Sequence, residues 1–97
     1  MPWQGRIRDA RSRGEVVQVA RDFVAQLSPA EVDRLPVECK PRAIETEADL
    51  QEYALLRARH HAHGDAARLI VKLSEFFSNA AARLAQLARR DTASNQR

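Results

Sequence analysis

His60, His61 and His63 lie close together in the sequence and are followed by Asp65. Imidazole and carboxylate groups are common ligands of zinc and related metals. On a helix, His60 and His63 share a face while His61 points about 100° away, so at most two of these histidines bind one ion unless the helix unwinds. A site would then need Asp65, or a residue of a second copy, as a further ligand. Histidines also act as favourable cations in the last turn of a helix. We favour that structural role, with His60, His63 and Asp65 kept as a remote candidate metal site.

The segment His-Ala-His-Gly-Asp, residues 61–65, resembles part of the His-x-His-x-Asp-His ligand motif of the metallo-β-lactamase superfamily. This resemblance implies a dinuclear metal hydrolase built on an αββα sandwich, with further ligands far along the chain. It covers five residues, and Ala66 stands where that family has its next histidine. A chain of 97 residues with helical patterning cannot supply the sandwich. We therefore do not assign the chain to this superfamily.

No other residue pattern is typical of catalysis. Cys39 is the only cysteine, and although Lys40 and Arg42 beside it would favour its thiolate, no histidine lies near it in the sequence. We expect an inert, buried or half-buried thiol. The sequence also has no glycine-rich phosphate loop, no Ser-His-Asp pattern and no paired-cysteine metal motif. We therefore expect neither an enzyme nor a bound cofactor, and no small-molecule substrate is evident.

Positive charge is concentrated at the two ends of the chain, within a formal net charge of +3. Residues 1–14 contain four arginines against one aspartate, residues 83–97 have the same balance, and the middle of the chain is mildly acidic. An arginine-rich arm can hold nucleic-acid phosphates with little sequence specificity. Such an arm lacks the apolar face of a membrane-bound helix, so we expect no membrane partner. Nucleic-acid binding is the alternative function, through the four arginines of the N-terminal arm: Arg6, Arg8, Arg11 and Arg13.

The sequence predicts a cytoplasmic protein. No apolar run approaches the roughly eighteen residues of a membrane span. The first six residues lack the apolar stretch of a secretory signal. A single cysteine excludes an internal disulfide, which is typical of a reducing compartment.

Apolar spacing and helix-start signals predict one all-α domain over 14–90, between a basic flexible arm over 1–13 and a polar flexible tail over 91–97. The first helix is expected over 14–27. An earlier start is the alternative, because Ile7, Ala10 and Arg11 fit the same period, but Gly14 inside the helix would then cost about 1 kcal/mol. A short helix over 29–34 should follow the capping-box pattern of Ser28 and Glu31 and end before Pro36. Four residues of the irregular connector over 35–44 are expected in the core: Leu35, Val37, Cys39 and Ile44.

The second half of the chain predicts a long antiparallel helical hairpin. A second capping-box pattern, Thr46 with Asp49, starts a helix that runs to about residue 61 or 63. Gly64 is expected in the left-handed conformation that ends a helix, and Asp65 should cap a final helix over 65–90. Because so few residues separate the two helices, we expect them to pack side by side in opposite directions.

The final helix has more apolar surface than one partner helix covers. Its roughly 26 residues would span about 39 Å, beyond the roughly 32 Å diameter of a compact domain of this length, and its apolar side chains form two adjoining stripes. We therefore predict a homodimer whose bundle is completed by the second copy, or a complex with another protein. The predicted function is a small interaction or regulatory protein. Its interface would be formed by Leu69, Leu73, Phe76, Phe77, Ala80, Leu84 and Leu87.

Overall fold

The computed structural model describes residues 3–58, 64 and 66–95 of the chain. It is mostly helical, with no strand within those ranges, which confirms the predicted all-α class. No helix among the described residues is long and apolar enough to pass through a lipid bilayer. In chain order the elements are α1 Trp3–Asp9, α2 Arg13–Ala25, α3 Pro29–Asp33, the 3-10 helix η1 Val37–Cys39, α4 Glu47–Ala58 and α5 Ala67–Asn95.

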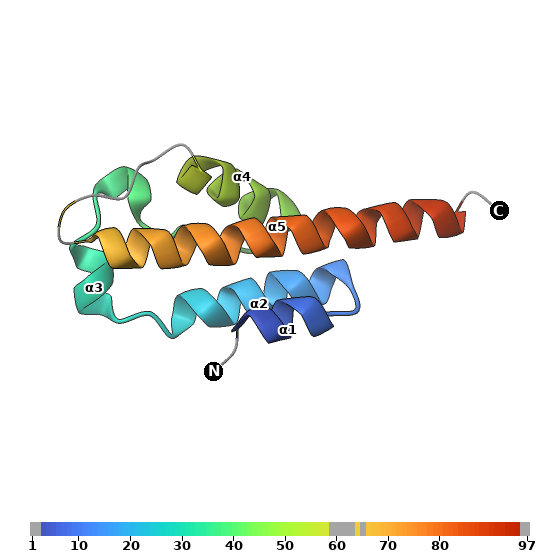
Figure 1. The fold of residues 1–97 in the computed structure, drawn as a ribbon, viewed down its shortest axis with the longest axis horizontal. Helices are drawn as coiled ribbons and strands as arrows, with labels where there is room; N and C mark the ends of the chain where they lie inside the picture. The colour runs from blue at the N-terminus through green and yellow to red at the C-terminus, as the bar shows by residue number, and fades with distance from the viewer. Residues whose placement is uncertain (1–2, 59–63, 65, 96–97) are drawn as a thin grey trace.

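Helix α5 forms the long axis of the molecule, and the other helices lie along it (Figure 1). Helix α4 packs on one side of α5, α1 and α2 pack on the other, and α3 and η1 lie near its N-terminal end. The 29 residues of α5 make it about 44 Å long. This length accounts for most of the 51 Å longest dimension of the molecule. The C-terminal end of α5 extends beyond the other helices.

All five aromatic side chains of the sequence meet in one cluster that joins α1, α2, α4 and α5. Phe23 of α2 stacks on Phe76 of α5 with ring centroids 3.9 Å apart. Phe77 packs edge-on against Tyr53 of α4 at 4.6 Å. Trp3 lies edge-on to both members of the stack, at 5.5 and 6.3 Å. Because consecutive residues of a helix point about 100° apart, one turn of α5 contacts helices on both of its sides.

The structure differs from the predicted flexible arm over 1–13, because residues Trp3–Asp9 form helix α1. The segment has few apolar groups, which suggested that it could not offset its ordering entropy. Its apolar residues nevertheless share one helical face. Ile7 and Ala10 are each 3% exposed, and Trp3 joins the aromatic cluster. That face is stabilised by α2 and α5 rather than by the segment itself. At the other end, α5 continues to Asn95 through most of the predicted flexible tail.

Two helix starts are closed by capping hydrogen bonds, one of them predicted. The Asp49 backbone N–H donates to Thr46 Oγ1 at 3.2 Å, and the Asp49 carboxylate accepts the backbone N–H groups of Glu45 and Thr46 at 3.0 Å. The predicted capping box of α4 is therefore confirmed. The same backbone donors lower the pKa of Asp49. The second cap was not predicted: the Glu15 backbone N–H donates to Ser12 Oγ at 3.1 Å and starts α2.

Two details of the connector region differ from the sequence predictions. Ser28 precedes α3 but makes no capping hydrogen bond with its side chain, so the predicted capping box does not form. Val37 was expected in the core and is 84% exposed. The reason is the 3-10 geometry of η1, in which residues two apart point to different sides. The other predicted anchors are buried: Leu35, Cys39 and Ile44.

Gly64 has a φ of 75°, the left-handed backbone expected for a glycine that ends a helix. The predicted continuation of the preceding helix to residue 61 or 63 and the predicted Asp65 cap lie outside the described residues. Helix α4 runs antiparallel to α5 (Figure 1), and their contact at Tyr53 and Phe77 lies inside the aromatic cluster.

Candidate functional site

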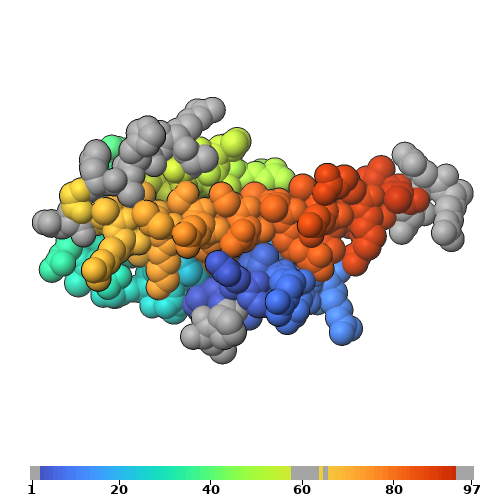
Figure 2. Space-filling view, in the orientation of Figure 1, coloured from blue at the N-terminus to red at the C-terminus, as the bar shows by residue number. Residues whose placement is uncertain are grey.

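The residues predicted to form a dimer interface are core residues of the single chain. Phe77 is 0% exposed, and Leu69, the most exposed of the set, is 8% exposed. The prediction assumed that one helix covers one stripe of α5, but α4 covers one side and α1 with α2 cover the other (Figure 2). Helix α1, absent from the predicted fold, helps α2 to bury this second side of α5. The premise of an uncovered apolar face is therefore wrong for the whole set: Leu69, Leu73, Phe76, Phe77, Ala80, Leu84 and Leu87.

The candidate metal ligands His60, His63 and Asp65 lie outside the described residues, as does His61. Within the ranges that the structure describes, no three His, Cys, Asp or Glu side chains come together in a group that could hold a metal ion. The metal site therefore stays a sequence-based prediction.

The arginines of α1, predicted to bind nucleic acid, form ion pairs with carboxylates of the same chain. Arg6 Nη2 lies 2.8 Å from a carboxylate oxygen of Asp22 on α2. This contact, with a further hydrogen bond from Gln18, lowers the pKa of Asp22. Arg8 lies 3.4 Å from Asp9. Because a neighbouring carboxylate offsets the attraction of an arginine for phosphate, α1 is less suited to nucleic acid than its sequence suggested.

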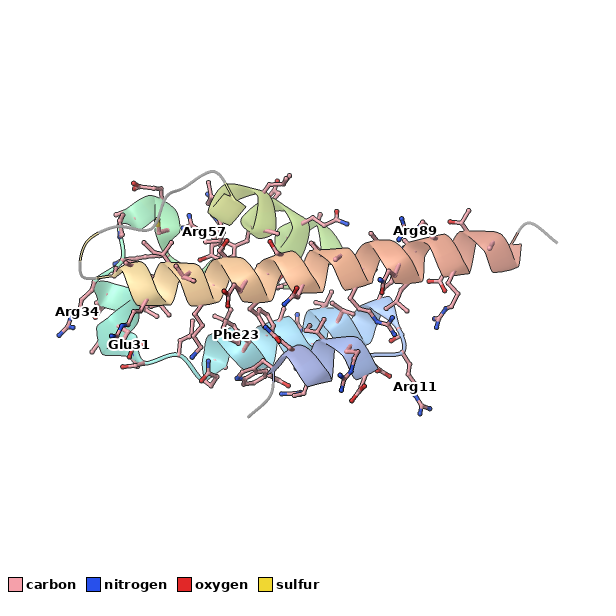
Figure 3. All side chains as sticks on the ribbon, in the orientation of Figure 1. Arg11, Phe23, Glu31, Arg34, Arg57 and Arg89 are labelled. Carbon is pink, nitrogen blue, oxygen red and sulfur yellow. The ribbon has the colours of Figure 1, made fainter. Side chains whose placement is uncertain are left out.

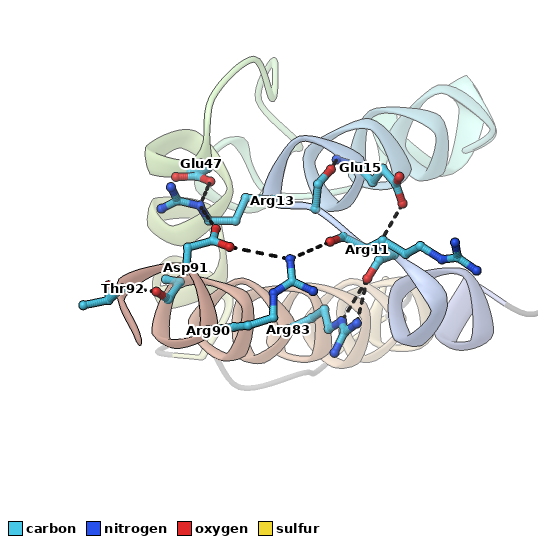
Figure 4. A network of polar contacts seen from close by, with 11 residues as sticks. Arg11, Arg13, Glu15, Glu47, Arg83, Arg90, Asp91 and Thr92 are labelled. Atoms are coloured by element: carbon cyan, nitrogen blue, oxygen red, sulfur yellow. Dashed lines mark hydrogen bonds and ion pairs between the residues drawn. The ribbon is translucent and has the colours of Figure 1, made fainter. Parts of the chain in front are cut away.

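A polar network around the turn between α1 and α2 connects this turn to α4 and to the last turns of α5 (Figure 4). Arg13 lies between two carboxylates, 3.3 Å from Glu47 and 3.2 Å from Asp91. Arg90 Nη2 donates to the backbone oxygen of Arg11 at 2.8 Å. Among the four arginines predicted to hold phosphates, only Arg11 has no ion pair with a described carboxylate. Arg6 and Arg13 therefore connect helices of the fold, whereas Arg8 and Arg11 are exposed.

Cys39 and Tyr53 form a buried contact between η1 and α4. The Tyr53 hydroxyl donates to the Cys39 backbone oxygen at 2.7 Å. Burial raises the pKa of Tyr53 to about 12, because the tyrosinate anion would lose its hydration there. The Cys39 side chain is buried, as expected from the sequence. This contact holds η1 against the core.

Arg57 is an unusual feature of the core, because its guanidinium is 1% exposed without a carboxylate partner among the described residues. Its Nη2 donates to the Glu38 backbone oxygen at 2.8 Å, and the group lies 5.2 Å from the ring centroid of Tyr53. Nε and Nη1 are buried and have no hydrogen-bond partner within the described part of the chain. Buried charges are normally paired. Arg57 lines none of the hollows described below, so we regard it as a structural cation that holds η1 on α4.

A pocket of about 320 Å³ lies between α3 and the first turns of α5. Glu31 and Arg34 line it from the α3 side, where Figure 3 shows both beside the N-terminal end of α5. Arg68 and Lys72 line it from α5, one helical turn apart. Ala66 and Leu69 provide its apolar surface.

The charge of this pocket is strongly unbalanced, with three cations against one carboxylate. Arg34, Arg68 and Lys72 form no ion pair with any carboxylate that the structure describes. Lys72 Nζ lies 5.8 Å from the ring centroid of Phe23, which places its ammonium beside α2. Within α5 as the structure describes it, the first turn has no acidic residue. The pocket can therefore hold an anion.

Two other hollows flank α1, and their charges are better satisfied within the described part of the chain. One of about 530 Å³ between α1 and α2 is lined by two arginines and two carboxylates. The other, of about 250 Å³ between α1 and α5, contains Arg83, whose Nε and Nη2 both donate to the Ala10 backbone oxygen. The pocket between α3 and α5 is thus not the largest, and its excess of two positive charges equals that of the hollow between α1 and α5, which Arg8 also lines. It differs because none of its three cations has an ion pair or a side-chain hydrogen bond to a described residue, whereas Arg8 pairs with Asp9 and Arg83 donates to Ala10.

Sequence reasoning missed this pocket. Arg68 and Lys72 have the spacing that places two side chains on one helix face, which was a usable signal. Arg34, however, belongs to a segment that looked acidic, with Glu31 and Asp33 beside it. Only the packing of α3 against α5 brings Arg34 to the other two cations.

Comparisons with protein families, curated proteins and solved structures found no match to this chain.

Proposed function

We propose that the protein is a small, non-enzymatic binding protein whose ligand has an anionic group that occupies the pocket between α3 and α5. The supporting observation is that Arg34, Arg68 and Lys72 line one hollow without an ion pair to a described carboxylate. Like charges brought together repel one another. A bound anion would remove that repulsion, so binding and folding should stabilise each other.

The residue types indicate which anion would bind and how tightly. Two guanidinium groups offer forked N–H donors that fit phosphate or carboxylate, and Lys72 adds a point charge. All three side chains are exposed to solvent. Exposed ion pairs contribute about 0.2–1 kcal/mol each, so three contribute roughly 1–3 kcal/mol. We therefore expect a bare phosphate to bind with a dissociation constant of about 6 mM or weaker, and affinity to fall with added salt.

Titration of inorganic phosphate into isotope-labelled protein at low salt, followed by amide NMR, tests this proposal. The expected result is saturable shifts confined to α3 and the first turns of α5. The R68E variant should bind phosphate at least tenfold more weakly. R89E is the matched control, since Arg89 is an exposed residue farther along α5 and its replacement changes net charge equally. Shifts spread over the whole surface, or equal weakening by R68E and R89E, would refute a specific anion pocket.

Self-association is kept as a separate proposal with its own test. It no longer rests on an uncovered face of α5. Light scattering decides it: a homodimer has twice the chain mass of 10.9 kDa.

Nucleic-acid binding through the N-terminal segment is likewise a separate proposal. Replacing all four arginines would also break the ion pairs of Arg6 and Arg13. Arg11→Ala is the cleaner variant, because Arg11 is exposed and contributes only backbone atoms to the polar network. A mobility shift at low salt that weakens in this variant would support the proposal.

A further inference from the structure

Glu31 is the only carboxylate among the described residues that line the cationic pocket, and it restricts what the ligand can be. Glu31 lines the same hollow as the three cations and is one helical turn from Arg34 on α3. It forms no ion pair with any of them. An ionised carboxylate is only an acceptor of hydrogen bonds. A ligand that uses the whole pocket therefore needs a hydrogen-bond donor a short distance from its anionic group.

The charge balance of the pocket favours a neutral donor. Three cations against Glu31 leave an excess of positive charge, so an ammonium group on the ligand would be repelled. A hydroxyl group donates to a carboxylate without that repulsion. The ligand should therefore combine an anion with hydroxyl groups.

The volume of the pocket restricts the class of ligand further. A volume of about 320 Å³ lies at the lower end of the roughly 300–1,000 Å³ of small-molecule pockets. A phosphate joined to a short polyol or a single sugar suits a pocket of this size, whereas a nucleotide, which adds a heterocycle, needs a larger one. A short phosphorylated carbon chain or ring fits.

We propose that the ligand is a small phosphorylated sugar or polyol. Its phosphate lies among Arg34, Arg68 and Lys72, and one of its hydroxyl groups donates to Glu31. This assignment rests on the proposed function, because it requires that the pocket hold an anion.

Calorimetric or NMR titration with ribose 5-phosphate, inorganic phosphate and ribose tests the assignment in the full chain. Ribose 5-phosphate should bind about tenfold more tightly than phosphate, the size of effect expected from a hydrogen bond to a charged group. Ribose alone should not bind. In E31Q the ratio between ribose 5-phosphate and phosphate should fall below threefold, while phosphate binds equally well or better because one negative charge has been removed. D33N makes the same charge change on the same helix outside the pocket and should keep the tenfold ratio.

The possible failures can be told apart. If phosphate does not bind, the proposed function fails and this assignment fails with it. If phosphate binds but ribose 5-phosphate binds no more tightly, or E31Q and D33N change the ratio equally, the sugar phosphate assignment is overturned while the anion pocket stands. A nucleoside monophosphate that binds more tightly than ribose 5-phosphate would also overturn it, because the size argument would then be wrong. Thermal melting of E31Q and D33N verifies that both variants are folded.

Discussion

Replacing Phe77 with alanine tests whether the apolar face of α5 belongs to the core of one chain or to an interface between chains. Phe77 is fully buried in the single chain. Its ring centroid lies 6.2 Å from that of Phe23, 4.6 Å from that of Tyr53 and 5.2 Å from that of Phe76. These neighbours come from α2, α4 and α5. The cavity left by alanine would therefore be surrounded by three helices and could not close without moving them.

The expected loss of stability is large. Phe-to-Ala substitutions in cores lower the free energy of unfolding by about 3–5 kcal/mol, and more where the site cannot collapse. Three aromatic contacts of about 0.5–1.5 kcal/mol each would be lost together, which places Phe77 near the upper end, at about 4–5 kcal/mol. A domain of this size is stable by about 5–15 kcal/mol. At about 4–8 °C for each kcal/mol, Tm should fall by roughly 16–40 °C.

Urea and thermal unfolding followed by circular dichroism, at two protein concentrations, measure this effect. The matched control is L55A, because Leu55 is 61% exposed on α4 and its truncation should change stability by no more than about 0.5 kcal/mol. A loss below about 1 kcal/mol for F77A would refute the core assignment. So would a loss that depends on protein concentration and accompanies a halved mass in light scattering, which is the behaviour of an interface residue.

Three further experiments, one on pH dependence and two on substitutions, test the polar contacts of the fold. The contribution of Tyr53 to stability should be constant below pH 10 and fall by up to about 3 kcal/mol between pH 10 and 12, because burial raises the pKa of Tyr53 to about 12 and favours its neutral form. Tyr53 is the only tyrosine, so ultraviolet absorbance follows its ionisation directly. Thr46→Ala should cost about 1 kcal/mol, whereas Ser28→Ala should cost close to zero, because only Thr46 makes a capping hydrogen bond. Arg57→Met should leave stability unchanged or raise it by about 1 kcal/mol, since it removes two buried nitrogens that lack partners among the described residues, and the exposed Glu38 can be hydrated. Urea unfolding measures each of these changes.

Specific results would contradict each of these expectations. A Y53F variant that shows the same loss between pH 10 and 12 would assign the pH dependence to another group. Equal losses in T46A and S28A would show that the capping hydrogen bond contributes nothing. A loss above about 2 kcal/mol in R57M would show that the guanidinium is better paired in the folded protein than its surroundings indicate.

Local signals in the sequence were reliable where the interaction is itself local. The Thr46 and Asp49 capping box formed, Gly64 took the left-handed conformation, and the first long helix lies within two residues of its predicted bounds of 14 and 27. The same reasoning failed for Ser28, whose capping pattern is equally good in the sequence. A capping hydrogen bond is weak compared with the packing of the helix that it starts. Packing therefore decides whether a capping residue is used.

By itself the sequence determined the helical class and the apolar face of α5, because the spacing of apolar residues requires that this face be buried. It did not determine what buries the face, since hydrophobic burial has no directional preference. The tertiary structure assigned that task to α4, α2 and an N-terminal helix whose Trp3 and Ile7 looked too isolated to fold. The tertiary structure also forms the cationic pocket, because Arg34 and Arg68 line the same hollow only after the chain folds back on itself. The spacing of apolar residues is a property of one helix, whereas the burial of its apolar face and the charge of a pocket depend on segments far apart in the chain.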